Sequence, residues 1–488
     1  MKNKSLIAIC ICLAIVSNLK AQSKKATFSK EEKSIVAGID NKSKEYGEIA
    51  QKIWEFAELG YMEHESSALL QNKLKAAGFK VEAGVAGMPT GFVAYYGEGK
   101  PVIGILAEFD ALPGISQTAD PFKQIREDSK AGHACGHHLY GTGSSAGAIA
   151  VKEWLEKTGT SGTIRLYGTP AEEGGSGKAY MVRAGLFDDT DVVLNWHAGS
   201  INNASAGSCL AIKSANFRFY GIASHAAGAP HRGRSALDGV EAMNNMANMM
   251  REHVPQESRI HYVITSGGEA PNVVPAFAEV NYYVRHPQMK NVKEIFERLV
   301  LIAKGAAMGT GTTMDYEVSG GAYNLLPNVT LARMMHSNLE KVGGVVYTEQ
   351  EKEFAVKIME TYPSEGLAPE DAAKVSTFIV REQAGPYSTD TGDVSWVVPT
   401  TGLRTATWVP GTSSHSWQAV AAGGTDIGRK GMIVAAKTLA LTAIEIYKNP
   451  VIVAKAKEEW LERRGKDFKY EALIGDREVP LDYRKGVE

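Results

Sequence analysis

The sequence predicts an α/β fold: a catalytic domain with helices packed on a mostly parallel sheet, and a smaller β-α-β-β-α-β domain inserted into it. Three observations support this prediction. Apolar, strand-like runs alternate with helix-patterned segments in the first half of the chain, the order of elements changes near residue 214, and residues 432–447 return to a helical pattern. A length of 488 residues suits about two domains.

The first half of the chain supplies the elements of the larger domain. Residues 29–77 are predicted to be largely helical, because their apolar positions recur at helical spacing, and Gly78 ends this pattern. The strands expected next are residues 91–96, 101–107, 163–168 and 191–196, and the helices between and after them are residues 142–157 and 178–184.

The inserted unit follows in a different order. We expect a strand at 216–222, a helix at 236–251, strands at 260–265 and 278–285, a helix at 292–307 and a strand at 313–318. This order is typical of a ferredoxin-like split unit. The predicted organisation is a catalytic domain of residues 22–213 and 323–450, an inserted domain of residues 214–322, and a charged tail of residues 451–488 on the surface.

The N-terminus has the pattern of a secretory signal peptide, predicted to be residues 1–21. Lys2 and Lys4 precede an apolar run at 6–16, and the run ends near Ala21. The alternative is a buried N-terminal helix. We therefore expect an exported protein, periplasmic or secreted. We expect no membrane span, because no segment has about 20 consecutive apolar residues. A formal net charge of −2 gives no electrostatic basis for binding nucleic acid.

A first candidate site lies in residues 131–138, where alanines and glycines separate three histidines and Cys135 just before a predicted helix. Small residues let the backbone approach a bound group closely, and Cys135 and His137 can present a thiolate and an imidazole to one point. Histidines in such a loop can also be merely structural. Because Cys10 and Cys12 belong to the predicted signal peptide, a disulfide between Cys135 and Cys209 is a competing interpretation.

A second candidate site follows the strand predicted at 163–168, where Glu172 and Glu173 stand side by side in a turn. Adjacent carboxylates repel each other unless a cation lies between them or one pKa is raised, although two solvated glutamates would also fit. His197 follows another predicted strand, and His415 lies in a polar loop; each could be an incidental loop histidine. The ends of parallel strands meet at one sheet edge, which favours a shared site.

The combined ligand set exceeds what one tetrahedral zinc ion takes. It consists of Cys135, His137, Glu173, His197 and His415. We therefore predict two divalent metal ions. Zinc is expected because thiolate, imidazole and carboxylate donors favour it, and manganese is the alternative because oxygen and nitrogen donors suit it. Glu172 is left over and is predicted to act as the general base.

These motifs, taken in order, resemble the metal-dependent amidohydrolases that include aminoacylases, glutamate carboxypeptidases and auxin-conjugate hydrolases. The resemblance covers nearly the whole chain after the signal peptide. It is carried by residues 108–113, 133–138, 170–174, 195–198, 224–231 and 271–275 and by His415.

The resemblance implies roles for individual ligands. Cys135 would bridge the two metal ions, with His137 and His197 on one and Glu173 and His415 on the other. Asp110 would orient His137, as metal-bound imidazoles generally require. The sequence departs from relatives at two positions: His138 stands where many have aspartate, and Glu108 stands where other branches have a metal-binding histidine.

The resemblance also implies that the inserted domain is a lid and a dimerisation surface, in a homodimer or in a dimer with a related subunit. His225 would stabilise the oxyanion, in the site of the partner subunit, and Asn272 and Arg285 would hold polar groups of the substrate. The ordinary alternatives are two turn residues and a surface cation.

The function expected from the sequence is metal-dependent hydrolysis of the amide bond of a small N-acyl or N-aroyl amino acid, with p-aminobenzoyl-glutamate as the first candidate substrate. A dipeptidase or an N-acyl amino acid deacylase is the alternative within the same class. A non-catalytic binding protein of this fold is disfavoured, because it would have no use for Glu172 as a base.

Overall fold

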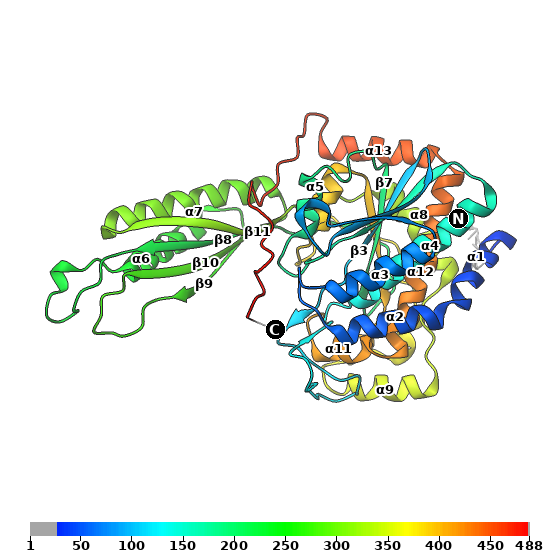
Figure 1. Cartoon of the computed structure of the whole chain (residues 1–488), viewed down its shortest axis with the longest axis horizontal. Coiled ribbons are helices and arrows are strands. Elements are labelled where there is room, and N and C mark those ends of the chain that lie inside the picture. Colours follow the sequence, from blue (N-terminus) through cyan, green and yellow to red (C-terminus); the bar gives the residue numbers. More distant parts are fainter. Residues whose placement is uncertain (1–26, 487–488) are drawn as a thin grey trace, which may run out of the picture.

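The computed structural model describes residues 27–486, and its two larger sheets each have their own apolar core. The predicted signal peptide at 1–21 lies outside the described residues. In Figure 1 the smaller sheet and its helices project from one side of the larger lobe. Among the described residues, no helix has both the length and the apolar character needed to cross a membrane.

The larger lobe is built on a six-stranded sheet in the order β1-β2-β6-β3-β7-β12. Strands β6, β3, β7 and β12 run parallel to one another, and β1 and β2 complete one side as antiparallel strands. The bounds are β1 Lys80–Ala83, β2 Phe92–Glu98, β3 Val102–Ala107, β6 Gly162–Gly168, β7 Val192–Gly199 and β12 Thr400–Ala406. The predicted mostly parallel sheet is confirmed.

The parallel strands form because their sequences are apolar on both faces. All six residues of β3 are buried, as expected of a central strand covered by helices on both sides. Helix α4 (His137–Thr158) packs on β3, β6 and β7, and α12 (Asp426–Lys448) packs on α4, β7 and β12. These two helices therefore fix the strand ends that carry the candidate site.

The remaining helices of the larger lobe surround this core (Figure 1). They are α1 Lys30–Asn41, α2 Ser43–Phe56, α3 His64–Ala76, α5 Gly177–Arg183, α8 Val329–Val342, α9 Glu349–Met359, α10 Thr391–Val397, α11 Trp417–Gly423 and α13 Val451–Arg464. A short hairpin pairs β4 (Leu112–Pro113) with β5 (Ala131–Gly132).

The smaller lobe has the predicted β-α-β-β-α-β order and forms an antiparallel sheet in the order β11-β8-β10-β9. Its elements are β8 Ala211–Tyr220, α6 Ala236–Met250, β9 Arg259–Ser266, β10 Phe277–His286, α7 Met289–Thr310 and β11 Thr313–Ala322. Alternate residues of β10, such as Val280, Tyr282 and Val284, are buried against α6 and α7, and the residues between them lie on the open face.

Two examples show where the structure departs from the sequence-based expectations. Strand β12 had not been predicted, because its sequence, TTGLRTA, lacks a clear apolar pattern. Part of the expected surface tail is also packed: α13 buries Trp460, and Leu473 and Ile474 farther on are buried as well.

Candidate metal centre

The candidate ligands gather at the carboxyl ends of the parallel strands. Asp110 follows β3, the Glu172–Glu173 pair follows β6, and His197 lies near the end of β7. His415 comes from the loop after β12, and His137 starts α4. Open α/β sheets place their binding sites at this edge, so the predicted convergence is confirmed in space.

Cys135 lies at the centre of this cluster. Its Sγ atom is 3.5 Å from His197 Nε2 and 3.5 Å from His415 Nε2. The backbone around Cys135 is tightly constrained: Gly136 has a φ of +75°, and a Cβ atom there would lie 2.4 Å from the side chain of Ala198. Only glycine can therefore place the thiol and α4 in this arrangement.

Glu173 approaches Cys135 and His415 from the turn after β6. Its Oε1 atom is 3.4 Å from His415 Nε2, and its backbone N–H donates to Asp110 Oδ2 at 2.9 Å. Ala171, at the start of the turn, has a φ of +56°, a conformation that L-residues rarely adopt. The turn is thus held in an uncommon shape that directs both glutamates toward the cluster.

Asp110 holds His137 as well as Glu173. Its Oδ1 atom is 2.9 Å from His137 Nδ1, so that nitrogen carries the proton that it donates. His137 Nε2 is then left as a lone-pair donor, 3.0 Å from Glu108 Oε2, and neither of these two buried atoms has a hydrogen-bond partner. Two acceptors at this distance require a proton or a cation between them.

The geometry fits a pair of metal ions. The donor atoms form three groups, and the atoms of each group lie within 4.8 Å of one another. The groups are Cys135, His137 and His197; Cys135, Glu173 and His415; and Glu108, His137 and Glu172. Cys135 belongs to the first two groups, as a bridging thiolate would. Glu173 Oε1, like His137 Nε2, is buried without a hydrogen-bond partner. Sulfur, imidazole and carboxylate donors together suit zinc, and the nitrogen and oxygen donors among them also suit manganese.

The pKa shifts reflect both the burial of the cluster and the carboxylates crowded within it. Burial and then Glu108 raise the pKa of Glu172 well above its ordinary value, and burial followed by Glu173 does the same for the pKa of the Cys135 thiol. Burial alone would lower the pKa of His137, but Glu108 and Asp110 outweigh it and raise that pKa strongly. A cation would relieve these repulsions.

Sequence reasoning missed a buried charge network behind the ligands. Lys178 on α5 is fully buried, and its Nζ atom lies 2.7 Å from Glu108 Oε1 and 2.6 Å from Asp390 Oδ1. One signal could have indicated it. Lys178 stands in the first turn of α5, where the helix dipole disfavours a cation unless carboxylates accompany it.

The other predicted site residues, His225 as a catalytic group and Asn272 and Arg285 as substrate-binding groups, all lie in the small lobe. His225 and Asn272 are in neighbouring loops beyond β8 and before β10, where the Ala226 N–H donates to the Asn272 carbonyl. Arg285 lies at the other end of β10, opposite Ile212 at the entry to the small sheet. Eight residues of strand separate Arg285 from Phe277, which is roughly 27 Å.

The competing disulfide interpretation is wrong. Cys135 and Cys209 are both free, buried thiols. The Cys209 Sγ atom instead accepts a hydrogen bond from the backbone N–H of Leu325 at 3.4 Å, in the segment that rejoins the larger lobe.

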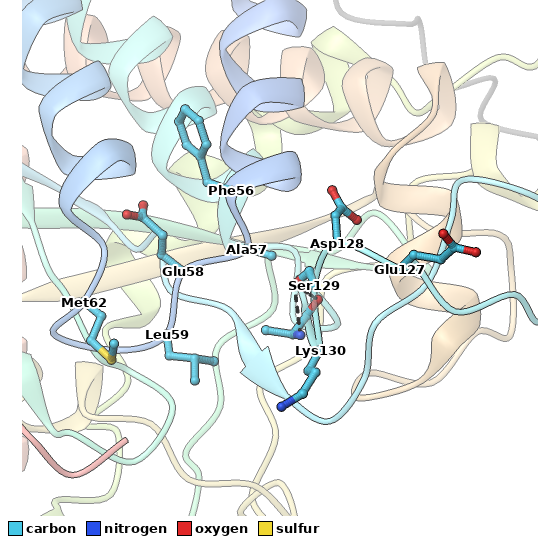
Figure 2. A pocket seen from close by; sticks show the side chains of 10 residues that line it. Phe56, Ala57, Glu58, Leu59, Met62, Glu127, Asp128, Ser129 and Lys130 are labelled. Carbon is cyan, nitrogen blue, oxygen red and sulfur yellow. Dashed lines mark hydrogen bonds between the residues drawn. The ribbon is translucent and has the colours of Figure 1, made fainter. Parts of the chain in front are cut away.

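A surface hollow of about 400 Å³ lies beside the hairpin that leads to Cys135, but no candidate ligand lines it. Figure 2 shows its walls, which come from residues 56–62 on one side and residues 127–131 on the other. Glu58, which lines this hollow, is already engaged, because its carboxylate accepts hydrogen bonds from the first turn of α3. The chemistry is therefore assigned to the metal cluster and not to this hollow.

Comparisons with known proteins agree with this geometry. Residues 104–415, which include every candidate ligand, match the peptidase family M20/M25/M40. The chain is 40% identical to a subunit of p-aminobenzoyl-glutamate hydrolase of Escherichia coli over 446 residues, covering 86% of this chain and 93% of that protein. It is 30% identical to the Xaa-Arg dipeptidase of Mus musculus over 438 residues, covering 86% and 90% respectively.

A solved structure shares the fold. The chain resembles a dinuclear metal-binding peptidase of the M20 family from Bacillus subtilis with a TM-score of 0.56 and 17% identity, over 85% of this chain and 99% of that one. The family match and the relatives at 30% identity or more cover most of the chain. The chain therefore belongs to the peptidase family M20/M25/M40 and is a hydrolase that acts on amide bonds.

Proposed function

We propose that this protein is a dinuclear metal-dependent amidohydrolase that cleaves the amide bond of a small N-acyl or N-aroyl amino acid. The first candidate substrate is p-aminobenzoyl-glutamate. The observation that carries the proposal is the position of Cys135 between two groups of donor atoms, with Glu172 beside them. The 40% identical relative from Escherichia coli, which belongs to a p-aminobenzoyl-glutamate hydrolase, supports the choice of substrate.

The ligands would divide around the shared thiolate. Cys135 would contact both ions, with His137 and His197 completing one site and Glu173 and His415 the other. When bound, two divalent ions, zinc by preference and manganese as the alternative, would polarise a carbonyl and make water nucleophilic at neutral pH. Asp110 would keep the His137 ring in the orientation and tautomer that binding needs, because it accepts the Nδ1 proton.

Glu172 would carry the proton through the reaction. It would take a proton from the attacking water and deliver it to the leaving nitrogen, so that the amide C–N bond breaks and an acid and an amine leave.

The small lobe would complete the site in a dimer. His225 lies in the loop after β8, at the end of this ten-residue strand opposite the end where the chain enters the small lobe, and it belongs to none of the three donor groups. We therefore place it in the site of a partner subunit, where it would stabilise the oxyanion. Asn272 and Arg285 would bind polar groups of the substrate, such as the carboxylates of glutamate. The partner is a second copy of this chain or a related protein. The relatives from Escherichia coli include two different subunits of p-aminobenzoyl-glutamate hydrolase, which supports the latter.

We also propose that the protein is exported, on the basis of Lys2, Lys4 and the apolar run that follows them. N-terminal sequencing of the protein from its own cells tests this. Export predicts a mature chain starting near residue 22, and an intact N-terminus in the cytoplasmic fraction would contradict it.

The second candidate activity is that of a dipeptidase acting on substrates with C-terminal arginine, which the 30% identical Xaa-Arg dipeptidase supports. A panel of p-aminobenzoyl-glutamate, other N-acyl-glutamates and Xaa-Arg dipeptides separates the two. We expect the highest kcat/KM for p-aminobenzoyl-glutamate, followed through the release of p-aminobenzoate. A higher value for the dipeptides would favour the second activity.

The role of Glu172 is tested with Glu172→Gln, which keeps the shape of the side chain and removes its basicity. We expect kcat to fall by about 10²–10⁴-fold with the metal content unchanged, because a general base contributes about this much. Asp128→Asn, at an exposed carboxylate away from the cluster, is the control and should leave kcat unchanged. A Glu172→Gln enzyme with near-parent kcat would assign the proton transfer to another group.

A further inference from the structure

The C-terminal segment of residues 470–486, called the C-terminal strap below, runs from beyond the end of α13 to the metal cluster. In Figure 1 it descends in red between the two lobes. Arg477 pairs with Glu317 and donates to the Ser319 carbonyl, both on β11 of the small lobe. Arg183 on α5 of the large lobe donates to the carbonyls of Gly475 and Arg477. The strap is thus fixed along its length by both lobes.

The end of the strap contacts the turn that carries the two glutamates. The Tyr483 hydroxyl donates to the Glu173 carbonyl at 3.1 Å, and Arg484 donates to the same oxygen at 2.6 Å. A carbonyl oxygen has two lone pairs, so these two donors satisfy it fully. The contact joins positions more than 300 residues apart in the sequence.

Tyr483 is itself held against the same turn. Its ring packs edge-on against Tyr61, with ring centroids 5.6 Å apart. The Tyr61 hydroxyl donates to the Gly175 carbonyl at 2.8 Å, two residues beyond Glu173. The carbonyl groups on both sides of Gly174 therefore accept hydrogen bonds from two tyrosine hydroxyls and one guanidinium.

Glu173 needs this support because its turn is strained. Ala171 and Ser176, which flank the turn, have φ values of +56° and +60°, and such conformations persist only where surrounding contacts impose them. Asp110 holds the Glu173 N–H from inside the protein. The strap holds the carbonyl of the same residue from outside.

We propose that the C-terminal strap is a working part of the metal centre, with Tyr483 and Arg484 as positioning residues that hold the Glu173 carboxylate in place for its metal ion. This inference rests on the proposed function of the cluster. Positioning groups behind a metal ligand typically change metal affinity or activity by about 10–100-fold. We expect an effect of this size when both donors to the Glu173 carbonyl are removed.

The test uses the full-length enzyme with Tyr483→Phe combined with Arg484→Met, which removes both donors and keeps the ring and the aliphatic stem. Lys485→Met is the matched control, since Lys485 is the next residue, is exposed, and does not donate to Glu173. Zn²⁺ affinity is measured by competition with a chromophoric chelator, the melting temperature on the metal-free proteins, and kcat and KM on p-aminobenzoyl-glutamate.

We expect the double variant to bind Zn²⁺ about tenfold or more weakly, with lower kcat, a nearly unchanged KM and a metal-free melting temperature like that of the control. The single variant Arg484→Lys keeps a cationic donor at this position, so its Zn²⁺ affinity should be closer to that of the parent than the affinity of Arg484→Met. Unchanged Zn²⁺ affinity, or a loss fully matched by a lower metal-free melting temperature, would overturn the proposal. A parent enzyme that binds Zn²⁺ but hydrolyses no amide would instead count against the proposed function, and the affinity comparison would still decide the role of the strap.

Discussion

At the scale of single residues, the cluster depends on a buried lysine that no motif marks. Lys178 forms ion pairs with both Glu108 and Asp390, and Glu108 in turn lies against His137. All of these side chains are almost fully buried. Buried charges need partners of opposite sign, because an unpaired buried charge costs several kcal/mol.

Lys178→Met should therefore destabilise the metal-free protein strongly. We expect a loss of about 3–5 kcal/mol in the free energy of unfolding, because two carboxylates would lose their cation. Lys352→Met, which removes surface ion pairs with Glu349 and Glu370, is the control and should lower the free energy of unfolding far less, because solvent screens these charges. Urea unfolding in the presence of a chelator measures the stability of both variants. Equal losses of stability would show that the buried network contributes no more than a surface ion pair.

The candidate ligands were predictable from the sequence, and the groups behind them were not. Cys135, Glu173 and His415 each stand in short polar loops rich in small residues, which local patterns reveal. Lys178 and Asp390 meet only through the fold, more than 200 residues apart, and no periodicity connects them. Glu108 could be identified from its motif, but its contact with His137 could not be predicted, because it depends on the fold.

At the scale of elements, α10 carries a carboxyl group whose protonation is tied to folding. Asp393 is completely buried; it accepts hydrogen bonds from the Tyr470 hydroxyl at 2.7 Å and the Tyr323 N–H at 3.1 Å. Burial outweighs these bonds and raises the pKa of Asp393 to about 7. The native protein thus keeps a proton that an unfolded aspartate loses near pH 4.

Stability should therefore fall as the pH rises from about 4 to about 7, by at most about 1.4 kcal/mol per pH unit from this group, because the unfolded state binds fewer protons there. Asp393→Asn removes this contribution. Relative to the parent, the variant should gain stability steadily between about pH 5 and pH 7 in urea unfolding of the metal-free protein. A difference that does not change with pH would contradict the assignment.

The elements were predicted unevenly, for physical reasons. Strands β3, β6 and β7 are buried on both faces and read as continuous apolar runs, so the sequence indicates them well. Strand β12 contains Thr, Gly and Arg and is a strand because it pairs with β7. The helix expected at 142–157 starts earlier, at His137, because Gly136 provides the left-handed residue that starts it.

At the scale of the whole molecule, His225 lies in the small lobe and belongs to none of the three donor groups of the metal cluster. If His225 acts in the site of a partner subunit, two inactive variants should complement each other. Mixing Glu172→Gln with His225→Ala should restore about one quarter of the parent activity, because half of randomly mixed dimers are heterodimers and each has one intact site.

The mixture is compared with each variant alone under the same exchange conditions, and light scattering follows the oligomeric state. A mixture no more active than the sum of its components, in a protein that does exchange subunits, would place His225 outside the partner's site. The sequence predicted the inserted lobe because its β-α-β-β-α-β order is local. The route of the C-terminal strap to Glu173 was not predictable, since it depends on how the two lobes and the chain end pack together.

The proposed chemistry depends above all on two metal ions held around Cys135. The most direct measurement is a titration of the metal-free enzyme with Zn²⁺ while the release of p-aminobenzoate from p-aminobenzoyl-glutamate is followed. We predict no activity without metal and a rise that ends at two equivalents per chain. Full activity without metal, or a plateau at one equivalent, would contradict the two-metal centre.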